Sequence, residues 1–191
     1  ADLADFLCSC GAHISGAGSG EITVCGMKKL HSAEHTVIPD RIIASTYMAA
    51  AAVTGGDVHI LDTRAEHITP VIPVFEQAGC KVDCGENSVH ISAPVRLRSV
   101  QTVRTMPYPG FPTDSQAAVM AMLSVAHGTS VMIENIFENR YRHVRELCRL
   151  GADIMTEGKV AVIKGVETLT GACVCLSLIH ISEPTRRVVI S

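Results

Sequence analysis

The sequence predicts an α/β fold, of the α+β kind, built from a repeated unit of roughly 70 residues. The pattern of Gly11–Ile14 returns as Gly79–Val82 and again as Gly151–Ile154, in steps of 68 and 72 residues. A second pattern, Val53–Ile60, recurs as Val125–Met132, again 72 residues apart at the second glycine. Two independent patterns at one period indicate internal repetition rather than chance.

Each repeat is expected to have the element order βαβαββ. An alanine-rich helix ends at a glycine, where a left-handed backbone is least costly, and a strand, a second amphipathic helix and a pair of strands follow. The expected helices are Thr46–Val53, Ser115–Ala126 and Arg142–Leu150, and the expected strands are Glu21–Val24, Val58–Leu61, Val131–Ile133, Asp153–Met155 and Val160–Ile163. Val144, Leu147 and Cys148 share one face of the last helix. Ala117–Val125 is apolar nearly all round, which predicts burial between sheets.

Composition and charge exclude several classes of protein. The chain has 191 residues, of which 47% are hydrophobic, 18% charged and only 4% aromatic, so it can fill a core. A net charge of −3 argues against a nucleic-acid partner, and Arg142, Arg145 and Arg149 fit a solvated helix face better than a nucleic-acid face. The longest apolar stretch, Ile42–Val53, has 12 residues and is too short to cross a bilayer. With no secretory leader in view, we expect a cytoplasmic protein without a membrane partner.

The spacing of the cysteines decides how they are interpreted. The chain has 8 cysteines, in CxC and CxxxC patterns with no CxxC. Zinc ribbons and redox motifs need CxxC or paired histidines, so we expect no metal site and no cofactor. Reduced, half-buried thiols of an intracellular protein are the simpler interpretation.

One loop, Arg104–Gln116, breaks the repeat and has the features of a chemical site. Its three prolines exclude helix and central strand and stiffen the connection. Thr113 and Gln116 fit a capping box, which places Asp114 in the first turn of the following helix. An oriented carboxylate can accept a proton from a substrate hydroxyl, provided that partial burial raises its pKa. The alternative, which the residues alone favour, is a plain first-turn acid that stabilises the helix.

A second segment, Glu134–Tyr141, follows an expected strand end, a common place for ligand sites in α/β folds. Its polar side chains, Glu138, Asn139 and Arg140, can bind an anionic ligand or cap the next helix, and the residues leave both interpretations open.

Three strings in the chain closely resemble one family of enzymes. They are Ile38–Ile42 (IPDRI), Phe111–Ala117 (FPTDSQA) and Ile136–Val144 (IFENRYRHV). They are similar to strings of the UDP-N-acetylglucosamine 1-carboxyvinyltransferases, which are enolpyruvyl transferases, and the resemblance runs from about Ala1 to Val174. It implies an inverse α/β barrel of two domains with three βαβαββ units each, here incomplete. Residues 1–36 would be the end of the first domain, and residues 37–175 two units of the second.

The resemblance also implies an activity and a set of site residues. The enolpyruvyl group of phosphoenolpyruvate would move to the 3′-hydroxyl of UDP-N-acetylglucosamine, with release of phosphate, in the first committed step of peptidoglycan synthesis. Asp114 would contact that hydroxyl as the catalytic base, with Thr113 beside it. Ile136 would contact the sugar nucleotide through its backbone, and Arg140 and Arg41 would lie near the cleft. A relative acting on shikimate 3-phosphate, or a non-catalytic remnant that binds the sugar nucleotide, are the alternatives.

The departures from the family predict an inactive fragment. Family chains are more than twice as long, and this sequence has no counterpart of their N-terminal Lys-Asn pair, their cysteine-bearing loop or a later arginine that grips phosphoenolpyruvate. Asp114 alone cannot protonate the enolpyruvyl methylene and hold two anions, so we expect no turnover by this chain alone. From about Leu176 the chain departs from the family pattern, and its back-translation looks like a sequencing adapter. We therefore expect residues 176–191 to be a non-native tail.

Overall fold

The computed structural model describes residues 1–174, which form two compact units that divide between Pro39 and Asp40. The expected adapter tail, from about Leu176, lies outside the described residues. In the first unit, α1 (Asp2–Ser9) precedes an antiparallel hairpin of β1 (His13–Ser15) and β2 (Thr23–Cys25). The carboxylate of Asp2 lies 2.9 Å from Nε2 of His35 and accepts the backbone N–H of Ile38 at 3.3 Å, which ties the end of this unit to its beginning.

The second unit begins with a module that starts on a helix. Its elements are α2 (Arg41–Thr54), β3 (Asp57–Leu61), α3 (Ala65–Ile68), α4 (Ile72–Gln77), β4 (Lys81–Cys84) and β5 (Ser88–Ser92), and the strands form an antiparallel sheet in the order β3-β5-β4. The helix α2 ends at Gly55 with a φ of 64°, as the sequence predicts. It begins at Arg41 rather than Thr46, because Asp40 caps it by accepting the N–H of Ile42 at 2.7 Å. The expected opening strand of this module is not found among the described residues, and the second helix is split into α3 and α4.

The second module has the full βαβαββ order, which confirms the predicted unit. Its elements are β6 (Thr102–Arg104), the 3₁₀ turn η1 (Thr113–Ser115), α5 (Gln116–Leu123), β7 (Thr129–Ile133), α6 (Val144–Arg149), β8 (Asp153–Glu157) and β9 (Val160–Lys164). The sheet has the order β6-β7-β9-β8, with β6 and β7 parallel and the other pairs antiparallel. A parallel pair needs a crossover, and η1 and α5 supply it.

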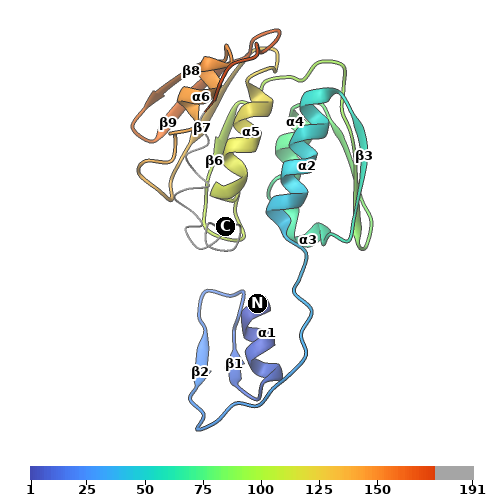
Figure 1. Cartoon of the computed structure of the whole chain (residues 1–191), viewed down its shortest axis with the longest axis vertical. Coiled ribbons are helices and arrows are strands. Elements are labelled where there is room, and N and C mark those ends of the chain that lie inside the picture. The colour runs from blue at the N-terminus through green and yellow to red at the C-terminus, as the bar shows by residue number, and fades with distance from the viewer. Residues whose placement is uncertain (175–191) are drawn as a thin grey trace. The chain divides into compact units, whose positions relative to one another are not determined.

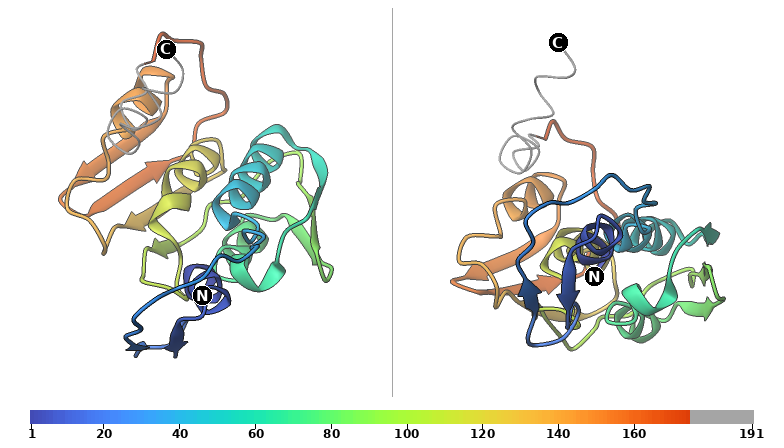
Figure 2. Two further views of the ribbon diagram at one scale, coloured as in Figure 1. Left: turned by 60° about the horizontal axis from the view of Figure 1, so that its bottom comes forward. Right: turned by 90° about the horizontal axis from the view of Figure 1, so that it is seen from below.

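The core lies where α2 and α5 pack side by side, as Figures 1 and 2 show. Burial of α5 is confirmed, since Val119, Met120 and Met122 are fully buried. Small side chains on the buried face of α2 let the two helices approach closely; they are Ala44, Ala51 and Ala52. The sheet of the first module flanks α2 and that of the second flanks α5 (Figure 1), so each helix is covered on both sides.

Further details differ from the sequence expectations. The helix α5 stops at Leu123 rather than Ala126, and Gly128 keeps a positive φ of 109° in the turn before β7. Cys148 on α6 is exposed, because α6 is short and buries only Val144. The cysteines are not half-buried as a group: of the seven that the structure describes, all free, two are buried (Cys10 and Cys80) and five exposed (Cys8, Cys25, Cys84, Cys148 and Cys173). Over residues 1–174, no helix is long and apolar enough to cross a membrane.

Candidate functional site

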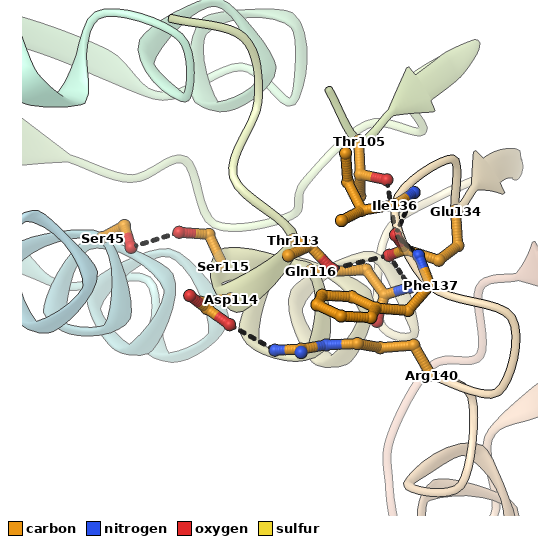
Figure 3. Close-up of polar contacts among 10 residues, drawn as sticks. All are labelled: Ser45, Thr105, Thr113, Asp114, Ser115, Gln116, Glu134, Ile136, Phe137 and Arg140. Atoms are coloured by element: carbon orange, nitrogen blue, oxygen red, sulfur yellow. Dashed lines mark hydrogen bonds and ion pairs between the residues drawn. The ribbon is translucent and has the colours of Figure 1, made fainter. Parts of the chain in front are cut away.

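Two loop segments meet at one edge of the second module's sheet. Because β6 and β7 pair in parallel, their carboxyl ends lie at the same edge, where the chain leaves β6 into residues 105–112 and leaves β7 into residues 134–143. Such edges are the usual place for ligand sites in α/β folds. Figure 3 shows the polar side chains that converge there, together with Ser45 of α2.

Asp114 lies in the 3₁₀ turn η1, ahead of α5, rather than in the first turn of α5 as the sequence suggests. Its carboxylate is 54% exposed and forms an ion pair with Arg140, which is itself 28% exposed. The partial burial that would favour a catalytic base is therefore missing, and contact with Arg140 orients the carboxylate instead. The proline-rich residues 105–112 contain no helix or strand, as predicted.

The predicted capping box is wrong. The hydroxyl of Thr113 donates to Oε2 of Glu134 at 2.8 Å, and Nε2 of Gln116 donates to the same oxygen at 3.2 Å. The N-cap of α5 is Ser115, whose side chain makes no capping hydrogen bond. The two polar residues that match the S/T-x-x-E/Q pattern therefore bind a third segment rather than each other's backbone.

Glu134 is a functional candidate that the sequence analysis did not single out. It follows β7 directly, it is only 1% exposed, and its Oε1 accepts the N–H groups of Ile136 at 2.8 Å and Phe137 at 3.1 Å. Burial by itself raises the pKa of Glu134, but hydrogen bonds from Thr113, Thr105 and these two amides outweigh it and leave the pKa below its usual value. A signal was present in the sequence: an acidic residue that ends an apolar strand, with threonines at both ends of the neighbouring loop.

Arg140 is held on two sides. Besides its pairing with Asp114, its side chain lies beside the Phe137 ring (Figure 3), and the guanidinium carbon is 5.0 Å from the ring centre. Neither Arg140 nor its neighbours Glu138 and Asn139 cap the next helix, since α6 has His143 as N-cap without a side-chain hydrogen bond. Of the two interpretations left open by the sequence, helix capping is wrong.

Arg41 approaches the same loop from α2. It is the first residue of that helix, and its guanidinium lies 5.8 Å from the centre of the Tyr108 ring in the proline-rich segment. The buried hydroxyls of Ser45, also on α2, and Ser115 lie 2.7 Å apart. The first module thus contacts the Asp114 segment at two points.

Tyr141 fixes the end of the second segment. Its hydroxyl lies 3.0 Å from the carbonyl oxygen of Met132 and 3.1 Å from that of Lys159, so it joins the segment to the sheet. Burial raises the pKa of Tyr141 to about 12, and the charge of Glu134 adds to the rise. Within residues 1–174, no group of three or more His, Cys, Asp or Glu side chains is placed to hold a metal ion.

The fold defined by these modules is that of the enolpyruvyl transferases. The enolpyruvyl transferase NikO from Streptomyces tendae superimposes with a TM-score of 0.70 at 24% identity, over 86% of this chain and 39% of that one. EPSP synthase from Acinetobacter baumannii gives a TM-score of 0.62 at 22% identity, over 84% of this chain and 39% of that one. At such identities the likeness shows the fold alone.

The chain belongs to the EPSP synthase (3-phosphoshikimate 1-carboxyvinyltransferase) family, whose model matches residues 1–177. Two curated relatives from Caldanaerobacter subterraneus subsp. tengcongensis, named UDP-N-acetylglucosamine 1-carboxyvinyltransferase 2 and 1, are 47% and 50% identical to it over 171 residues. A relative of the same name from Geotalea daltonii is 49% identical over 171 residues. Each alignment covers 90% of this chain but only 41% of the relative. The resemblance seen in the sequence is confirmed.

Proposed function

We propose that this chain is part of an enzyme that transfers the enolpyruvyl group of phosphoenolpyruvate to the 3′-hydroxyl of UDP-N-acetylglucosamine. The 47–50% identity with curated relatives of that name carries the proposal. In the reaction, the 3′-oxygen bonds to C2 of phosphoenolpyruvate, the bond from C2 to the phosphate oxygen breaks, and the hydroxyl proton ends on the released phosphate. The product opens peptidoglycan synthesis, and we place the reaction in the cytoplasm.

Asp114 is assigned as the base that accepts the proton of the 3′-hydroxyl. Its carboxylate is exposed and therefore reachable, and the turn that carries it is fixed by its neighbours Thr113 and Ser115. Orientation is what this arrangement supplies, because the ion pair with Arg140 and the two anchored neighbours hold the exposed carboxylate in place. A positioned base of this kind contributes about 10²–10⁴-fold to a rate.

Ile136 is assigned to the sugar nucleotide through its carbonyl oxygen. The resemblance implies a backbone contact, and the N–H of Ile136 already donates to Glu134 at 2.8 Å. Its carbonyl accepts no hydrogen bond found among the described residues, and the residue is half-buried beside the site. An acceptor at this place suits an N–H or O–H donor of the ligand.

Arg140, Arg41 and Thr113 complete the assignment. The two arginines bring positive charge to the loops, as a nucleoside diphosphate and a phosphorylated carboxylate require. Thr113 can meet a ligand only as an acceptor or through its backbone, since its hydroxyl proton is donated to Glu134. None of these residues offers a second acid for the enolpyruvyl methylene, so we expect the 191-residue chain alone to show no turnover.

The test is a chimera in which this chain's matched segment of 171 residues replaces the corresponding segment of a Caldanaerobacter relative. We expect phosphate release that depends on both UDP-N-acetylglucosamine and phosphoenolpyruvate. Asp114→Asn should lower kcat at least about 100-fold. Asp153→Asn, at the exposed start of β8, is the matched control and should behave like the parent chimera.

The same assay separates the alternatives. Turnover with shikimate 3-phosphate in place of the sugar nucleotide would refute the proposed substrate and favour the shikimate-pathway relative. Activity that survives Asp114→Asn unchanged would refute the assigned base. Phosphate release by the isolated 191-residue chain would overturn its expected inactivity, whereas saturable binding of UDP-N-acetylglucosamine without turnover would identify it as a binding remnant.

A further inference from the structure

Glu134 joins the two segments that carry the site. Its Oε1 accepts the hydroxyl of Thr105 at 2.8 Å and the backbone N–H groups of Ile136 and Phe137, as Figure 3 shows. Its Oε2 accepts from Thr113 and Gln116. One carboxylate therefore binds the turn of Asp114 through Oε2, and it binds both the start of the loop after β6 and the segment of Ile136 through Oε1.

Thr105 extends this network to the sheet. Its hydroxyl donates to Glu134 and accepts the N–H of Asn135 at 2.8 Å, while its own N–H donates to the carbonyl oxygen of Ile133 at 3.0 Å. The start of the loop after β6 is thus fixed to the start of the loop after β7. A slip of either loop by one residue would leave buried donors without an acceptor.

The charge of Glu134 is balanced by hydrogen bonds alone. No lysine, arginine or histidine forms an ion pair with it in the part of the chain that the structure describes. Burying a carboxylate without a cation is costly unless its lone pairs are filled, and five donors fill them here. An apolar side chain would fill the same space without that cost, so packing does not explain an acidic residue at this position.

We propose that Glu134 is a positioning residue that fixes Asp114 and the Ile136 carbonyl relative to each other, so that both can meet the substrate. The fixed relative position of the two segments follows from the contacts above, while the identity of the substrate rests on the proposed function. Glu134 does not touch the ligand, being 1% exposed, and acts through the backbone of its two neighbours and through Thr113.

Two substitutions separate the hydrogen bonds of Glu134 from its charge. Glu134→Gln keeps one acceptor oxygen for the two amides, and its NH₂ group can donate to Thr113, whose hydroxyl then accepts. Oε1 of Gln116, which is buried without a partner in the structure, can accept the second proton after the amide turns over. Glu134→Leu removes all five interactions. Glu86→Gln and Glu86→Leu, at an exposed position between β4 and β5, are the matched controls.

The first measurement is amide hydrogen exchange in the 191-residue chain, which needs no substrate. In Glu134→Leu we expect the amides of Ile136 and Phe137 to exchange at least about tenfold faster, while those of Met132 and Ala161 in β7 and β9 keep their protection. In Glu134→Leu, unchanged exchange at Ile136 and Phe137, or equal acceleration across the whole sheet, would overturn the proposal. Thr113→Val is the second variant should Glu134→Leu fail to fold: it should spare Ile136 and Phe137 but speed exchange of the Ser115 amide in the turn of Asp114, and an unchanged Ser115 amide would then overturn the proposal.

The second measurement uses the chimera described above. Glu134→Leu should raise the KM for UDP-N-acetylglucosamine and lower kcat at least about tenfold, because both the Ile136 carbonyl and Asp114 move, and Glu134→Gln should restore most of both. A variant that only lost folded protein would lower the apparent kcat without raising KM. An inactive chimera with Glu134 intact would refute the proposed function and leave the exchange result standing.

Discussion

A pair of serines joins α2 to the turn of Asp114. It leads to the prediction that Ser115→Ala destabilises the parent protein but stabilises the Ser45→Ala variant. Ser45 and Ser115 are 1% and 0% exposed, and their hydroxyl oxygens lie 2.7 Å apart. Ser45 also lies 3.0 Å from the carbonyl oxygen of Ile42, whereas no second acceptor for Ser115 is found among the described residues. Both protons are satisfied only if Ser45 donates to Ile42 and Ser115 donates to Ser45.

The magnitudes follow from this assignment. Ser115→Ala removes one neutral hydrogen bond and leaves Ser45 bonded to Ile42, so it should cost about 1 kcal/mol. Ser45→Ala leaves the buried hydroxyl of Ser115 without an acceptor, which costs about 1–3 kcal/mol, less about 0.5 kcal/mol regained from alanine's better helix propensity. The Ile42 carbonyl is not left empty, because Thr46 also donates to it at 2.7 Å. In the Ser45→Ala background, Ser115→Ala should therefore stabilise the protein by about 1 kcal/mol.

Urea unfolding followed by far-UV circular dichroism measures this double-mutant cycle, since the chain has no tryptophan for a fluorescence probe. The parent, the two single variants and the double variant are compared under one set of conditions. The reasoning is refuted by a Ser115→Ala substitution that destabilises equally in both backgrounds. It is also refuted by a double variant that is less stable than Ser45→Ala alone.

Three further predictions concern ionisation and reactivity. The folded-state pKa of Glu134 lies below the usual 4.5, so its contribution to stability is present above pH 4.5 and lost on acidification below it. Below that pH, the urea midpoint should fall more steeply for the parent than for Glu134→Gln. Plots of urea midpoint against pH that run parallel for the two proteins would contradict this. Tyr141→Phe should remove a phenolate absorbance step near pH 12, and a step that persists would place it on another tyrosine. A maleimide reagent should label exposed Cys84 before buried Cys80: burial raises the pKa of both thiols, but it raises that of Cys80 to about 11 and also blocks access to it. Peptide mapping by mass spectrometry that found Cys80 labelled first would refute this order.

The repeat made the module predictable. The ends of its elements depend on local caps, helix propensity and turns, which the repeat does not show. Glycine spacing and period-two alternation sufficed for the βαβαββ order and for the hairpin of β8 and β9. The end of α5 was less predictable, because the sequence after Leu123 remains apolar while the backbone turns toward β7. The opening helix α2 starts at Arg41 rather than Thr46, because the Asp40 cap outweighs the lower helix propensity of the β-branched residues that follow it.

The FPTD and FENR strings named Asp114, Ile136 and Arg140 as candidate site residues, and their roles stay predictions. The structure brings Asp114 and Arg140 into contact, but the sequence did not indicate which partners bind the residues beside them. The capping pattern of Thr113 and Gln116 predicts the wrong partners, because a local pattern carries no information on the Glu134 carboxylate, which lies 21 and 18 residues further along the chain and accepts from both. A buried acid is recognisable only when the fold shows which donors surround it.

The structure explains how an exposed carboxylate can be held still. Asp114 lies between two residues whose side chains point into the protein, Thr113 onto Glu134 and Ser115 onto Ser45. These two anchors fix the backbone on either side, so the carboxylate needs no burial of its own to stay in place. The ion pair with Arg140 restricts the rotation of the Asp114 side chain. Burying Asp114 would orient it at the cost of access. Anchoring its neighbours keeps the carboxylate accessible and oriented, which is the condition that the base role proposed for Asp114 requires.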